Sequence, residues 1–94
     1  WSISTVDSDG DVGYYTSIAL DTNGRPHISY YDLTRGDLRH ARWTGGEWKI
    51  VAVDTPGNVG VYSSIAVDSS NTVHISHYDL ANRDLRYSRG RPEM

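Results

Sequence analysis

Residues 26–43 read PHISYYDLTRGDLRHARW, and residues 73–90 read VHISHYDLANRDLRYSRG. The two stretches start 47 positions apart, and the same offset aligns WSISTVDSDGDVGYYTSIALD (1–21) with WKIVAVDTPGNVGVYSSIAVD (48–68) without a gap. A fixed period of this size is typical of repeat proteins, in which each unit buries its apolar face against a neighbouring unit. The repetition therefore decides the architecture before any single residue is considered.

The length of 94 residues corresponds to one small domain, which we divide into repeats 1–47 and 48–94. The chain has no cysteine, and it has no apolar run long enough for a membrane span. The net charge is −3, and eight of the nine basic residues are arginines that are scattered singly. We therefore expect neither a nucleic-acid partner nor a membrane partner, and the cellular compartment stays open.

Both repeats have a β-strand pattern without helical periodicity. Short runs rich in Val, Ile, Ser, Thr and Tyr are bounded by Gly, Asn and Asp, which is typical of strands joined by turns. Asn23-Gly24 predicts a two-residue hairpin turn, because both residues tolerate positive φ, and Asn71 replaces Gly24 in the second repeat. The longest predicted loops are 8–14 and 55–61. The predicted strands are 15–21, 26–32, 37–43, 48–54, 62–68, 73–79 and 84–89.

Four antiparallel strands in about 40–50 residues is the period of a β-propeller blade. We therefore predict an all-β chain with two four-stranded β-propeller blades. Residues 1–7 match the fourth strand at 48–54, whereas residues 90–94 are too short and polar to supply a fourth strand for the second repeat. We expect the N-terminal strand 1–7 to complete a blade, in its own ring or in a neighbouring chain. Two blades cannot close a ring, so oligomerisation completes it, unless the chain is an excerpt of a longer propeller.

Two families of propeller resemble this sequence. The stretch SIAVDSSNTVHISHYDLANRDLRYSR (64–89) resembles the NHL-type propeller repeat, and HISYYDLTRGDLRHARWTGGEW (27–48) is similar to the two-blade fucose-binding propeller lectins. The second resemblance implies a homo-oligomer, with a trimeric six-bladed ring favoured, and a glycan ligand. Tetramers or pentamers with eight or ten blades stay open, because the sequence does not fix the angle between blades.

The lectin resemblance also concerns particular residues. The lectin motif has a Trp after the Gly-rich turn, which Trp48 matches, and Trp1 is the repeat copy of Trp48. The motif also has an Arg on the aromatic strand and a Glu on the next strand. By our alignment these two places hold Ile28 or Ser29, and His40.

The aromatic residues are the candidates for ligand binding. The chain has seven Tyr, three Trp and no Phe, so every aromatic side chain carries a polar group that suits a binding surface. Alternatively, these rings form the core between blades. Trp43 is the strongest candidate, because Gly90 replaces it in the second repeat, whereas a structural wedge would be kept in both. The candidate ligand-binding residues are Trp43, Trp48, Trp1, Tyr30, Tyr31, Arg42 and His40.

Two polar patterns offer other chemistry. Asp7, Asp9 and Asp11 alternate, as calcium ligands do, but the alternative is that they cap strands and shape a loop. His27, Ser29 and Tyr31 with Asp32, a pattern repeated 47 residues later, could suggest acid–base catalysis. We favour hydrogen bonds that tie strands together, because residues two apart on a strand do not converge on a substrate.

The sequence therefore predicts a non-enzymatic binding module, a lectin-like, carbohydrate-binding propeller assembled from two-blade subunits. We expect no catalytic residues, no cofactor and no metal site, because no metal-ligand or phosphate-loop motif is present. The alternative is a structural or protein-interaction propeller segment of a larger surface protein.

Overall fold

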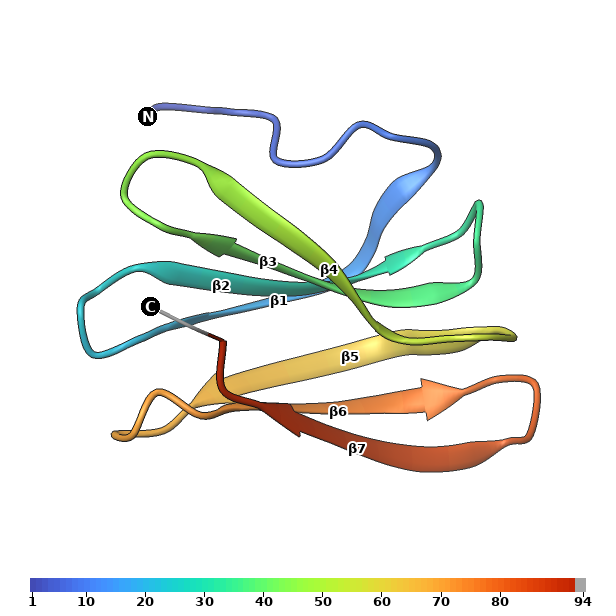
Figure 1. Ribbon diagram of the computed structural model, residues 1–94. Helices are drawn as coiled ribbons and strands as arrows, with labels where there is room; N and C mark the ends of the chain where they lie inside the picture. Colours follow the sequence, from blue (N-terminus) through green and yellow to red (C-terminus); the bar gives the residue numbers. More distant parts are fainter. Residues whose placement is uncertain (93–94) are drawn as a thin grey trace.

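A computed structural model describes residues 1–92, which form two antiparallel β-sheets stacked on one another (Figure 1). The first sheet has the strand order β1-β2-β3-β4 and the second β5-β6-β7. The all-β prediction is confirmed, and residues 1–92 include no helix that is long and apolar enough to cross a membrane. The strands are β1 Val12–Leu20, β2 Pro26–Asp32, β3 Asp37–Trp43, β4 Trp48–Asp54, β5 Val59–Val67, β6 Val73–Asp79 and β7 Asp84–Gly90.

The strands β2, β3, β4 and β6 have the predicted bounds, but β1 and β5 begin earlier than predicted. β1 starts at Val12 rather than Tyr15, because its first residues pair with β2 through two irregularities in register. Gly13 and Tyr15 there have φ values of 100° and 56°, and Gly60 and Tyr62 repeat them at 95° and 55°. Such bulges interrupt the alternation of side chains by which a strand is recognised in a sequence.

The two sheets have the same register, displaced by 47 residues. In the first sheet Val12 pairs with Asp32, and in the second Val59 pairs with Asp79. The pairing of β2 with β3 recurs in the same way between β6 and β7. The sequence repeat is therefore a repeat of backbone geometry.

The turn between β1 and β2 differs from the predicted two-residue hairpin. Gly24 N donates to Asp21 O at 2.9 Å and Asp21 N donates to Arg25 O at 3.0 Å, so the loop contains three residues. Gly24 alone takes positive φ, at 75°, because Asn23 occupies an ordinary turn position and the Asp21 carboxylate accepts its N–H. The counterpart Asn71 has φ 61°, which confirms that Asn serves at this left-handed position.

The interface between the sheets is partly apolar and partly hydrogen-bonded. β5 lies against β1, β2 and β3, and the buried cluster there comprises Leu38, Ile65, Val73 and Ile75. Close packing requires Gly60, since a Cβ there would lie 2.6 Å from Leu38 Cα.

A hydroxyl pair is buried in the same interface. Ser29 Oγ and Ser63 Oγ lie 2.8 Å apart, and Ser63 Oγ donates to Tyr15 O at 3.1 Å. Because Ser63 uses its own hydrogen on Tyr15 O, Ser29 is the donor within the pair. Both hydroxyls of this pair are thus satisfied inside the interface.

Residues 1–7 pair with no strand in the described part of the chain, although the sequence predicts a strand there. Trp1 and Ile3 are exposed, while Asp7 accepts a hydrogen bond from Tyr30 OH at 2.7 Å. The strand β7 likewise has one unpaired edge. The segment and this edge lie on opposite sides of the molecule, so one chain cannot join them (Figure 1).

Candidate functional site

The first sheet has one face toward the second sheet and one face toward the N-terminal segment. Along β2, Ser29 contacts Ser63 of the second sheet, whereas Tyr30 contacts Asp7. Tyr30 pairs with Arg39, and alternation along β3 places Trp43 on that same outer face. We call this the tryptophan face, and it carries Tyr30, Trp43 and Trp48.

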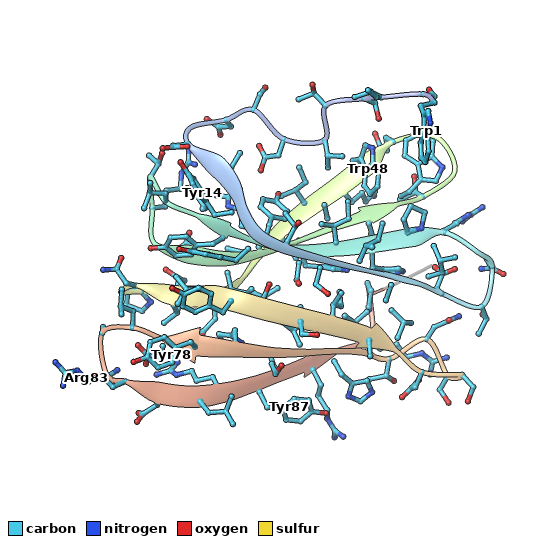
Figure 2. All side chains as sticks on the ribbon, turned by 180° about the vertical axis from the view of Figure 1, so that it is seen from behind. Trp1, Tyr14, Trp48, Tyr78, Arg83 and Tyr87 are labelled. Carbon is cyan, nitrogen blue, oxygen red and sulfur yellow. The ribbon has the colours of Figure 1, made fainter. Side chains whose placement is uncertain are left out.

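Trp43 and Trp48 form a cross-strand pair at the end of the β3–β4 hairpin. Their ring centroids lie 5.6 Å apart with an interplanar angle of 59°, and both side chains are partly exposed. The connecting turn is closed by Thr44 N, which donates to Glu47 O at 2.9 Å. Figure 2 shows Trp48 and Trp1 at the same end of the molecule.

Polar groups lie next to this tryptophan pair. A Cβ on Gly45 would lie 3.0 Å from Nη2 of Arg25, so the guanidinium packs directly against the turn. The Glu47 carboxylate is exposed on the same turn. Aromatic rings flanked by a guanidinium donor and a carboxylate acceptor can bind a sugar through ring stacking and hydrogen bonds.

The remaining predicted ligand residues are divided between the two faces. Tyr30 and Tyr31 are both buried, and their hydroxyls donate to Asp7 at 2.7 Å and to Asn58 at 3.1 Å. Burial, followed by the hydrogen bond to Asp7, raises the pKa of Tyr30 well above its usual range. His40 and Arg42 alternate with Trp43 on β3 and therefore lie on the opposite face. The structure brings Trp43, Trp48 and Tyr30 onto one face and separates them from His40, Arg42 and Tyr31.

His40 belongs to a buried chain of hydrogen bonds. His27 Nε2 lies 3.0 Å from Asp21 Oδ2, and His27 Nδ1 lies 2.9 Å from His40 Nε2. A carboxylate only accepts, so His27 donates from Nε2, and the Nδ1 of neutral His27 then accepts from His40. Burial, and secondarily the electrostatic effect of the neighbouring His27 and Arg42, lowers the pKa of His40 to about 4.

The second repeat has a related chain of hydrogen bonds. His74 Nε2 lies 2.9 Å from Asp68 Oδ2, and His74 Nδ1 lies 2.7 Å from the hydroxyl of Tyr87. A tyrosine hydroxyl therefore takes the place of the second imidazole. The recurrence of the chain with a different last member fits a role in holding strands together.

A cleft of about 300 Å³ lies between the two sheets. Gly90 lies there at the position that corresponds to Trp43. The absent indole side chain thus leaves space at this position. The lining residues are His40, Val51, Val53, Val73, Ile75, Ser88, Arg89, Gly90, Arg91 and Pro92.

A second cavity, of about 180 Å³, lies between the N-terminal segment and the tryptophan face. Nothing lies within 4 Å of a Cβ placed on Gly13, one of its lining residues. Around the counterpart Gly60, the same place is occupied by Leu38. The lining residues are Val6, Asp7, Val12, Gly13, Thr16, Ile28 and Tyr30.

The alternating aspartates of the candidate calcium pattern each have a different contact. Asp7 accepts from Tyr30, Asp9 forms an ion pair with Arg35 at 3.1 Å, and Asp11 accepts from Tyr14 OH at 2.9 Å. In the part of the chain that the structure describes, no group of three or more His, Cys, Asp or Glu is placed to hold a metal ion. These contacts fit the alternative in which the aspartates shape the loop.

Sequence reasoning missed two features of these sites. Arg25, which packs on the tryptophan hairpin, is replaced by Thr72 in the second repeat, and this difference was the available signal. The packing of Leu38 on Gly60 was marked only by a leucine and a glycine kept in both repeats. No protein-family model, curated protein or solved structure matches this chain.

Proposed function

We propose that this chain is a two-blade subunit of a self-assembled β-propeller and that the assembled ring binds carbohydrate. In this proposal the two sheets are successive blades. Residues 1–7 of one subunit pair with the open edge of β7 in the next subunit and supply its fourth strand. The chain carries no catalytic step in this role.

One observation carries the assembly proposal. The residues on each side of the interface between the sheets have counterparts in the other repeat, and no other sheet among residues 1–92 packs against these counterparts. Leu38 is fully buried against Gly60, whereas its counterpart Leu85 is 82% exposed and Gly13 borders an open cavity. Leu85 of a second copy would fill the cavity at Gly13, as Leu38 fills the space over Gly60. The same interface contacts have the counterpart pairs Leu85 and Gly13, Ser76 and Thr16, and Tyr78 and Asp11.

The position of Asp7 supports the role of the N-terminal segment. Asp54 ends β4 of the first sheet and lies 2.9 Å from His77 of the second sheet. Asp7 and Tyr30 are the counterparts of this pair, and they lie 2.7 Å apart. Asp7 thus lies against the first sheet as the end of a preceding fourth strand would.

The carbohydrate site in this proposal is the partly exposed surface around Trp43 and Trp48. At the junction between subunits, the tryptophan face lies opposite the second sheet of the next subunit. That sheet then borders the site and makes it concave. Arg25 offers donors and Glu47 an acceptor. Each single site is weak, and a ring that presents several gains avidity.

Native mass spectrometry and a glycan array test the proposal together. We expect a closed oligomer with an even number of blades that binds glycan, and Trp43→Ala should keep the oligomer and lose the binding. Lys49→Arg is the matched control, because Lys49 is exposed on the same hairpin and an arginine keeps the positive charge that pairs with Glu47, whose Oε1 lies 4.0 Å from Lys49 Nζ. A monomer contradicts the ring. A ring without glycan binding replaces carbohydrate by a protein-interaction role. Glycan binding that survives Trp43→Ala contradicts the assignment of the site to Trp43.

A further inference from the structure

We infer that an ion pair between Arg83 of one subunit and Asp11 of the partner subunit selects the junction between copies. The inference rests on the proposed ring and names the residues that direct its assembly. It follows from comparing the junction inside the chain with the positions at which the two repeats differ.

The junction inside the chain includes a very close approach at Gly36. A Cβ on Gly36 would lie 2.6 Å from Gly57 O and 2.9 Å from Asn58 Oδ1. Val59 N donates to Gly36 O at 3.1 Å, so the turn after β2 is attached to the loop before β5. Gly36 has no side chain, which allows this contact.

The corresponding residues at the free ends of the chain are charged. Arg83 takes the place of Gly36 with a similar φ, 61° against 74°, and Asp11 takes the place of Asn58. If the junction between copies repeats the junction inside the chain, the Cβ of Arg83 lies next to the carboxylate of Asp11 of the partner subunit. Its Cβ also meets the Gly10 carbonyl of the partner subunit, so this junction must open slightly to admit the side chain.

The charges at these positions are available for a partner. Arg83 forms no ion pair among residues 1–92, and Figure 2 shows its side chain directed away from the second sheet. The Asp11 carboxylate is exposed and accepts one hydrogen bond, from Tyr14. These two charges occur where the repeats differ, since Gly36 corresponds to Arg83 and Asn58 corresponds to Asp11. Asp9 is already paired with Arg35 at 3.1 Å, so Asp11 supplies the negative charge.

This arrangement distinguishes correct from incorrect assembly. Head-to-tail contact brings Arg83 to Asp11 of the partner subunit, whereas contact between like ends opposes two arginines or two aspartates and is disfavoured. At the junction between the two sheets of one chain, the corresponding residues are Gly36 and Asn58, which carry no charge. Neither Arg83 nor Asp11 of another copy is therefore attracted to that junction. The register that follows from β3 and β4 pairs Leu85 with Asp7 of the partner subunit and Gly90 with Trp1 of the partner subunit.

Charge reversal tests the inference on the whole chain by sedimentation at low and high salt. We expect Arg83→Glu and Asp11→Arg each to weaken association about tenfold or more at low salt, and the double variant to restore it. Arg83→Gly, which copies Gly36, should keep the ring and remove its salt dependence. Lys49→Glu is the control for net charge and should leave association unchanged.

The outcomes separate the inference from the proposed ring. A wild-type ring whose stability is unaffected by either reversal overturns the ion pair and leaves the ring in place. Loss in both single variants without restoration in the double also overturns it, provided that circular dichroism shows folded chains. A wild-type chain that stays monomeric removes both the ring and its junction.

Discussion

Gly60 and Leu38 lie closer together than any side chain at position 60 would allow, since a Cβ on Gly60 would come within 2.6 Å of Leu38 Cα. The counterpart Gly13 has open space around it. The two glycines have nearly equal φ values, 95° and 100°. The same substitution at both positions therefore separates backbone strain from steric clash.

Gly60→Ala should destabilise the single chain more than Gly13→Ala. Both variants carry the strain of positive φ, about 1–3 kcal/mol, while Gly60→Ala adds about 1–3 kcal/mol of overpacking against Leu38. Urea denaturation of each variant at a concentration that keeps the chain monomeric measures the difference. Equal losses would contradict the packing argument. In the proposed ring, Gly13→Ala should block assembly, because Leu85 of the partner subunit needs the same space.

Acid should lower the free energy of unfolding through His40. Its folded pKa of about 4 lies below the ordinary value of 6.5, so the unfolded chain binds more protons between these two pH values. Stability is therefore full above pH 6.5 and falls as the pH falls toward 4, by up to about 3 kcal/mol at the usual conversion.

His40→Tyr should remove that pH dependence. Tyr87 occupies the equivalent position and hydrogen-bonds His74 at 2.7 Å, so a tyrosine can keep the bond to His27 without titrating in this range. Thermal melting between pH 4 and 7 of the wild type and of His40→Tyr tests the point. A variant that keeps the full pH slope would assign the slope to other groups.

His27→Ala should cost more stability than His74→Ala. The His27 side chain is fully buried and its loss leaves Asp21 and His40 without their shared partner, at about 1–3 kcal/mol per unsatisfied group. The His74 side chain is 31% exposed, so water can replace its contacts with Asp68 and Tyr87. Unfolding of both variants in denaturant gives the comparison, and a larger loss for His74→Ala would contradict it.

Deletion of residues 1–7 should abolish assembly and leave the two sheets folded. The segment contributes no strand to either sheet, and its contact through Asp7 to Tyr30 is peripheral to the cluster around Leu38. Sedimentation measures assembly, and circular dichroism measures the sheets. A shortened chain that still forms the same ring would refute strand exchange.

The sequence allowed much of the fold to be predicted, because strand alternation and repetition are local properties. β2 and β3 were predicted with their observed bounds, since regular pairing preserves the period of two. The early start of β1 was not predictable, because Tyr15 has a positive φ that bulky side chains rarely adopt.

The candidate site was harder to predict than the strands. Trp43 and His40 are both predicted as ligand-binding residues, but their separation by three residues places them on opposite faces of β3. Arg25 lies on another strand connection and reaches the tryptophan hairpin only through the fold. Packing between distant segments decides which face of a sheet contacts another sheet. The sequence pattern of a single repeat does not contain this information.

The hydroxyl pair of Ser29 and Ser63 bears on the number of sheets in the proposed ring. The hydrophobic effect has no preferred direction, whereas a hydrogen bond of 2.8 Å in a buried interface favours one orientation of the two sheets. In a closed ring, the number of sheets is the full circle divided by the rotation from one sheet to the next. The Ser29–Ser63 hydrogen bond thus helps to set the angle between adjacent sheets. Replacing Ser29 or Ser63 should alter the number of sheets in the proposed ring while the strands themselves stay unchanged.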